Sequence, residues 1–127
     1  MALNRISFNG ILVGLAALVL CLSASGVALA QGTWADEIGN AVMFYQASYP
    51  HANWAPYLQE ITLVRDALGR GDQRIVKKEM GTFFKMLRTR AYDISDVAAD
   101  ELYNFAVMVT PLQEYGISLP AIPAQGQ

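Results

Sequence analysis

The sequence begins with an apolar block that constrains everything after it. Arg5 precedes an apolar run over residues 11–22, and Ala28-Leu29-Ala30 matches the small-residue pattern of a signal-peptidase site. A base, an apolar stretch and an A-x-A site in this order are typical of a signal peptide. We therefore predict cleavage near Ala30 and Gln31. Removal of residues 1–30 from the 127-residue chain leaves 97 residues, in the periplasm or outside the cell.

An uncleaved membrane anchor is the alternative for this block. Residues 11–30 are long enough for an apolar helix to cross a bilayer, which takes about 20 residues. Ser23, Ser25 and Gly26 suit the region before a cleavage site better than a spanning helix. A lipid attachment at Cys21 is disfavoured, because large residues precede it inside the apolar run.

The cysteine content follows from the leader. Cys21 is the only cysteine, so the mature chain has no disulfide, no thiolate nucleophile and no haem-attachment motif. Its stability then has to come from packing alone. A chain of this length can bury roughly 65% of its unfolded surface, which is adequate for a well-patterned core.

Apolar residues recur every three to four positions in four segments of the mature chain, which predicts amphipathic helices. The first is expected over residues 34–48, the second up to residue 69, the third over residues 73–92 and the fourth up to residue 116, with its regular part bent or ended at Pro111. The expected caps are Thr33, Asn53, Asp72, and either Asp93 or Ser95.

These segments predict an all-α fold, a small up-and-down antiparallel four-helix bundle over residues 31–116. A three-helix core with an irregular arm is the alternative. Gly81, inside the third helix, is interpreted as the mark of a close helix crossing, since mid-helix glycine is unfavourable. The uncharged residues 117–127, with Pro120 and Pro123, are expected to form an extended, loosely held tail.

Charge is strongly segregated along the mature chain. All eight of its Lys and Arg residues lie in residues 65–90, with only three acids, a balance of +5. Residues 31–64 and 91–127 together contain eight acids and no base. Such separation can steer a partner, or it can let neighbouring helices complement one another.

Two interpretations of the basic segment stay open. In the first, it is a solvated face with intrachain partners, Arg88 and Arg90 lying near Asp93 and Asp96. In the second, it is a docking face for an acidic protein surface on an envelope or membrane-bound complex, or for an anionic membrane surface. A nucleic acid is excluded as a partner, since the mature chain is acidic and exported. The docking residues on the basic helix would be Arg74, Lys77, Lys78, Lys85 and Arg88.

Trp54 and Tyr57, next to the loop around Pro50, are expected to be exposed aromatic side chains that contribute to the same kind of interaction. His51, the only histidine, is interpreted as polar surface, since zinc sites need more His or Cys ligands. Asp93 and Asp96 are interpreted as favourable charges at a helix start rather than as ligands.

No catalytic, cofactor or metal signature stands out in the sequence. The scattered methionines are interpreted as core residues rather than copper ligands. We therefore predict a non-enzymatic exported accessory or binding protein, a small helical subunit or assembly factor docking on an envelope protein complex. The alternative is a small periplasmic carrier that holds a ligand or a metal in the bundle interior.

Overall fold

The computed structural model of this chain describes residues 32–121, and this part is helical without a β-strand. The expected all-α class is confirmed. The predicted leader, its cleavage site and Cys21 lie outside the described residues. Within the described range, no helix has the length and apolar content needed to cross a bilayer. The elements are α2 (Trp34–Ser48), α3 (Ala55–Arg70), α4 (Gln73–Arg88), the 3-10 turn η1 (Ala91–Asp93), α5 (Asp96–Val109) and α6 (Leu112–Tyr115).

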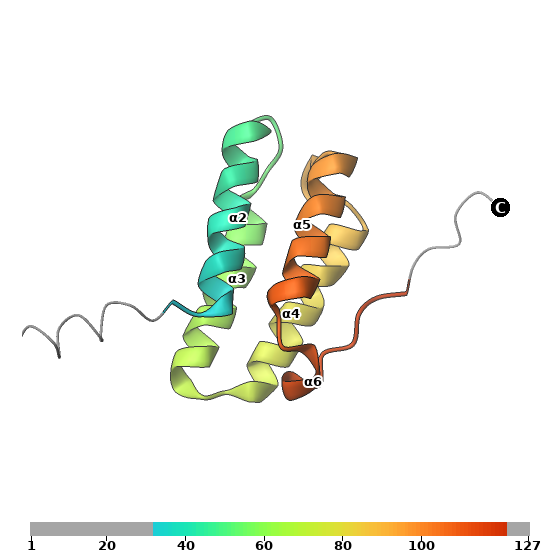
Figure 1. Cartoon of the computed structure of the whole chain (residues 1–127). Coiled ribbons are helices and arrows are strands. Elements are labelled where there is room, and N and C mark those ends of the chain that lie inside the picture. The colour runs from blue at the N-terminus through green and yellow to red at the C-terminus, as the bar shows by residue number, and fades with distance from the viewer. Residues whose placement is uncertain (1–31, 122–127) are drawn as a thin grey trace, which may run out of the picture. The chain divides into compact units, whose positions relative to one another are not determined.

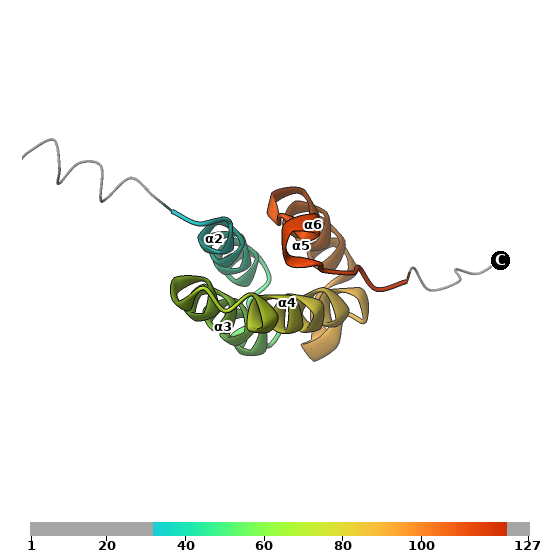
Figure 2. The same ribbon diagram turned by 90° about the horizontal axis from the view of Figure 1, so that it is seen from below.

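The four longer helices pack in a bundle-like arrangement in which each runs opposite to the one before it (Figure 1). Figure 2 shows two layers, with α2 and α5 on one side and α3 and α4 on the other. The most extensive contacts are between α3 and α4, and α2 and α5 each pack on a neighbour in the other layer. The short helix α6 packs against α4.

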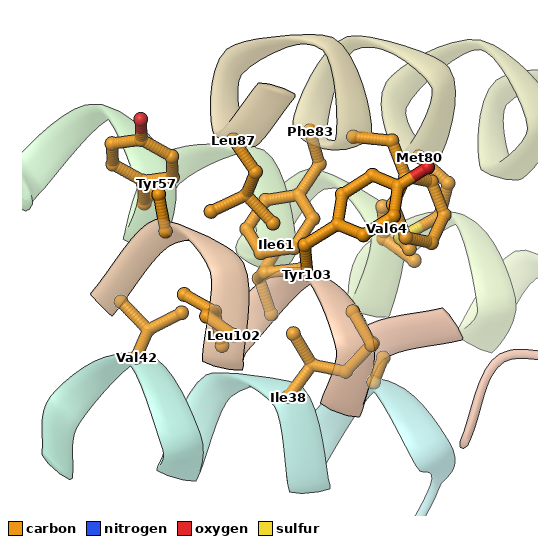
Figure 3. Packing of buried hydrophobic residues seen from close by; sticks show 14 of the residues in the cluster. Ile38, Val42, Tyr57, Ile61, Val64, Met80, Phe83, Leu87, Leu102 and Tyr103 are labelled. Atoms are coloured by element: carbon orange, nitrogen blue, oxygen red, sulfur yellow. The ribbon is translucent and has the colours of Figure 1, made fainter. Parts of the chain in front are cut away.

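The core lies between these two layers and takes residues from all four longer helices (Figure 3). The apolar face expected for the third helix is confirmed in full, since all its members are at most 1% exposed. They are Val76, Met80, Phe83, Phe84 and Leu87. The inner face of α5 is rotated from the expected one. Tyr103 and Ala106 are buried, whereas Phe105 and Val109 are only partly buried.

Three of the expected helix starts are confirmed. The Thr33 hydroxyl accepts a hydrogen bond from the amide of Asp36, and the Asp36 carboxylate accepts one from the amide of Thr33, a complete capping box. The Asp72 carboxylate caps α4 by accepting from the amide of Ile75, and the Ser95 hydroxyl caps α5 by accepting from the amide of Ala98. Asn53 was expected to cap the second helix, but the N-cap of α3 is Trp54, one residue later. The Asn53 side chain still contributes at this helix start, because its Oδ1 accepts from the amide of Ala55 at 3.3 Å.

The third helix ends earlier than expected. α4 stops at Arg88, not Tyr92, and the Thr89 hydroxyl donates to the carbonyl of Lys85 at 2.9 Å. Arg90 then adopts a left-handed conformation, with φ of 53°. The apolar spacing continued past this point, but the chain must turn here to bring α5 back onto the core.

The tail is less loose at its start than the sequence indicated. Gly116 adopts the left-handed conformation that closes α6, and the next amide, of Ile117, donates to the carbonyl of Leu112 at 2.9 Å. Ile117 is 8% exposed and joins the core. Residues 118–121 follow without helix or strand, and residues 122–127 lie outside the described range.

A basic face and a groove on helix α4

The outer side of α4 carries a row of basic residues. Positions 74, 77, 78, 81 and 85 are spaced at three, four or seven residues and so share one side of the helix. The residues at four of these positions, Arg74, Lys77, Lys78 and Lys85, are exposed. We call these four residues the basic stripe. It lies opposite the buried apolar face, as expected from an amphipathic helix.

A groove of about 470 Å³ opens along this side of α4. Its walls are Arg74, Lys77 and Lys78 from the stripe, Gly81 from the same helix, and Ser118 from the segment after α6. That segment passes beside α4 in both views (Figures 1 and 2). The fold therefore brings three of the proposed docking residues to one concave surface together with a residue of the tail.

Two of the four basic residues that flank the stripe, Arg65 and Arg90, are paired with carboxylates, whereas Arg70 makes no ion pair within residues 32–121. Arg65 on α3 lies 2.6 Å from Asp36 on α2, joining the ends of two helices. Arg90 lies 2.7 Å from Asp96 and 3.4 Å from Asp100. The expected pairing across the α4–α5 turn is therefore confirmed for Arg90 and Asp96.

Arg88 was expected either to pair with a carboxylate or to be a docking residue, and the structure places it differently. Its guanidinium lies 4.0 Å from the ring centroid of Tyr103, a cation–π contact, and the side chain is half-buried. It has no ion pair with a carboxylate among the described residues, and neither has Asp93. Arg88 is thus a packing residue at the α4–α5 contact more than a free cation.

The stripe itself has little intrachain compensation. Lys78 lies 3.5 Å from Glu79, while 69% of its side chain stays exposed, so the pair contributes little. Within residues 32–121, Arg74, Lys77 and Lys85 make no ion pair. The first turn of α4 also holds no acidic residue. A cation in the first turn, such as Arg74, and like charges three or four positions apart both oppose folding. The Asp72 carboxylate at the N-cap and the place of Lys85 in the last turn are favourable, so the unfavourable cations are those of the first two turns.

The exposure expected for two aromatic residues is wrong. Trp54 is 1% exposed and Tyr57 is 0% exposed. The Trp54 indole N–H donates to the carbonyl of Tyr49 at 2.8 Å, and the Tyr57 hydroxyl lies 2.7 Å from the carbonyl of Ala91. The Trp54 side chain is thus tied to the α2–α3 loop, and the Tyr57 side chain to the α4–α5 connection. Neither side chain can reach a partner while the helices stay packed.

A second concave surface lies at the opposite end of the helices. A cleft of about 340 Å³ is formed by the α2–α3 loop and the α4–α5 connection. His51 and Asp93, distant in the sequence, both line it and are both exposed. Ser48 and Ser95 are also in its wall. Their proximity depends on how two loops meet, so it could not be predicted from the sequence.

The α3–α4 contact also holds a pair of carboxyl groups that the sequence did not reveal. Glu60 on α3 faces Glu79 on α4, and Oε2 of Glu60 is buried without a hydrogen-bond partner within the described part of the chain when both groups are ionised. Burial and the neighbouring Glu79 raise the pKa of Glu60 to about 7. A signal was present, since Glu60 follows the core residue Tyr57 by three positions and so points toward the same side.

Metal binding finds little support in this geometry. Across residues 32–121, no three His, Cys, Asp or Glu side chains are grouped so as to hold an ion. The methionines do not cluster either, because Met43 is 51% exposed, Met108 is 76% exposed and Met80 is buried in the core. The expectation that the methionines are core residues is therefore correct for Met80 and wrong for Met43 and Met108.

These features define a small helical protein with a filled core, a basic face that has little intrachain compensation, and the groove and the cleft described above. Comparison of the chain with protein-family models, with curated protein sequences and with solved structures gave no match. Its function therefore has to be inferred from its own residues.

Proposed function

We propose that this chain is a non-enzymatic exported binding protein, an accessory subunit or assembly factor that docks on an acidic protein surface of an envelope complex. The basic stripe on α4 is the contact surface. Cleavage near Ala30 and Gln31 releases the domain into the periplasm or the medium. We assign its architecture to the antiparallel up-and-down four-helix bundles, which present rigid helix faces to partners.

The observation that carries this proposal is the uneven pairing of the basic residues. Arg65 and Arg90 are paired with carboxylates of neighbouring helices, whereas Arg74, Lys77 and Lys85 have no such partner within residues 32–121. Of these three, Arg74 lies in the first turn of α4, where a cation disfavours the helix, and Lys77 lies one turn later, whereas Lys85 lies in the last turn. Natural proteins break local rules mainly at functional sites, so a partner that supplies carboxylates is the simplest compensation.

The test is a charge reversal on the stripe. Lys77→Glu combined with Lys85→Glu is expected to abolish co-purification with the partner from a gentle extract of membranes and periplasm. The helical circular dichroism should be retained, because both side chains are exposed. The matched control is Arg65→Glu with Arg70→Glu, which changes the net charge equally on α3, away from the stripe. Co-purification that survives the stripe variant, or that is lost equally in the control, contradicts the proposal.

An anionic membrane is a distinguishable alternative for the same surface. Each base near such a surface contributes about 1 kcal/mol to binding. If vesicles containing anionic lipids bind the wild type as tightly as the protein partner does, and the stripe variant loses both, the docking target is the lipid head group. We expect weak vesicle binding, since three to four bases on one helix give only modest attraction.

A second candidate function rests on the cleft between the two loops. Its His51 and Asp93 favour a carrier of a small cationic ligand or metal ion, held at this surface cleft and not in the bundle interior, which is filled by side chains. Native mass spectrometry and elemental analysis of the purified mature protein test it. The carrier function requires a stoichiometric bound species that is lost in His51→Ala with Asp93→Asn.

A further inference from the structure

Gly81 is the residue of α4 that the fold itself does not explain. Glycine inside a helix costs about 0.5–1 kcal/mol relative to alanine. The sequence suggests a close helix crossing here, and this is wrong, because a Cβ at position 81 would meet no described atom within 4 Å beyond its chain neighbours and the nearby backbone of its own helix. Gly71 and Gly116, by contrast, have positive φ values of 70° and 63°. Position 81 has no such conformational need.

The surroundings of Gly81 point to a contact from outside. It lines the groove together with Arg74, Lys77 and Lys78, and it follows Arg74 by seven residues on the same side of α4. Two helical turns separate them, a distance of about 10 Å. Lys85 stands one turn beyond. The groove therefore has cationic groups at one end, a bare stretch of helix backbone at the other, and a further cation just past it.

We propose that this groove binds an extended, acidic peptide segment whose backbone lies against Gly81. The inference rests on the proposed function and specifies the chemistry of its partner. The separation between Arg74 and Gly81 matches about three residues of extended chain at roughly 3.3 Å each. Carboxylates of such a segment reach Arg74, Lys77 and Lys78, while the missing Cβ lets its main chain come close to the helix.

Two other occupants fit these features less well. A single phosphate or carboxylate needs the cations but gains nothing from a glycine two turns away. A flat acidic surface would meet Lys85 and Lys78 at their tips and would leave the groove empty. Only an occupant that enters the groove makes use of both the cations and the gap between α4 and Ser118.

The experiment compares two glycine substitutions. Gly69 lies inside α3, and a Cβ there also meets nothing within 4 Å of the described chain, but Gly69 does not line the groove. A fluorescein-labelled hexaglutamate peptide is titrated with the mature protein at low salt and followed by fluorescence anisotropy. Gly81→Ala is expected to weaken binding at least about tenfold and to raise the melting temperature. Gly69→Ala should leave the affinity within about twofold of the wild type.

If Gly81→Ala melts at a higher temperature and yet binds hexaglutamate more weakly, misfolding cannot explain the lost affinity. This result would support binding of the peptide in the groove. Lys77→Glu tests the contribution of charge and should also remove peptide binding. If Gly81→Ala binds hexaglutamate like the wild type while Lys77→Glu does not, the groove inference is overturned and the docking function survives. If wild-type protein does not bind the peptide, or inorganic phosphate displaces it at equal concentration, the inference is likewise overturned. If hexaglutamate binds all variants as tightly as the wild type, both the groove inference and the proposed docking function are contradicted.

Discussion

Tyr57 is the side chain on which the α4–α5 connection depends most directly. Its hydroxyl lies 2.7 Å from the carbonyl of Ala91 and 3.1 Å from that of Met86, so its single proton is shared by two acceptors. Among the described non-glycine residues, Arg90, Tyr92 and Asp93 have positive φ. Such backbone conformations cost on the order of 1–3 kcal/mol each and persist only when the surroundings hold them. Tyr57 is part of what holds them.

Replacing Tyr57 by phenylalanine should therefore destabilise the fold by about 1–3 kcal/mol, because two carbonyls lose their donor and the turn loses an anchor. Denaturant unfolding followed by circular dichroism measures this. Tyr92→Phe is the control, since Tyr92 is 49% exposed and its hydroxyl makes no hydrogen bond to the described chain. An equal effect of both substitutions would rule out the anchoring role.

Glu60 makes the folding stability of the protein depend on pH. Its pKa is raised from 4.5 to about 7 in the folded state by burial and by Glu79, partly offset by Lys78. Between these two values the folded protein binds a proton that the unfolded chain has released. The contribution of Glu60 to stability should thus be fully present below about pH 4.5 and should be lost as the pH rises to about 7.

Glu60→Gln tests this dependence. The expected contribution is about 1–2 kcal/mol, after allowance for solvent screening at a partly exposed site. Above pH 7 the variant should be more stable than the wild type, and its stability should change less between pH 5 and pH 7. Glu114→Gln, at an exposed position of α6, should keep the wild-type profile. Thermal melts at half-unit pH steps measure these profiles. Parallel plots of melting temperature against pH for the wild type and the two variants would disprove the role of Glu60.

The helices themselves were the most predictable part of the molecule. Thr33, Asp72 and Ser95 cap helices where the sequence placed them, because a cap depends only on residues three or four positions away. The start of α3 and the end of α4 were misplaced. Both ends lie at the loops that cover Trp54 and Tyr57, where distant contacts decide the backbone conformation.

The cap of α5 can be tested on its own. Ser95→Ala removes the oxygen that accepts the amide of Ala98 at 3.1 Å and should cost about 0.5–2 kcal/mol. Thr62→Ala is the matched control. Thr62 is exposed within α3 and donates only to the carbonyl four residues earlier, a bond that does not stabilise a helix. The two melting curves should separate clearly, and coincident curves would exclude a capping contribution.

For the whole molecule, the sequence revealed the charge segregation but not which charges are compensated. Arg65 and Arg90 find partners on other helices, and this follows from the tertiary packing. The groove depends on Ser118 coming back to α4, about forty residues from Arg74 along the chain. The cleft with His51 and Asp93 likewise depends on two segments that are distant in the sequence. Periodicity can place a residue on a helix face, but it cannot say which loop will lie over it.

The two loops at one end of the molecule are joined by a single main-chain hydrogen bond, from the amide of Asn53 to the carbonyl of Tyr92 at 3.1 Å. This bond connects the α2–α3 hairpin to the α4–α5 hairpin, so it can form only after both have docked. The Asn53 amide should therefore exchange its hydrogen more slowly than that of His51, and should gain protection late during refolding. Tyr57→Phe should speed exchange at Asn53 first, making this one proton a reporter of whether the two halves have closed on each other.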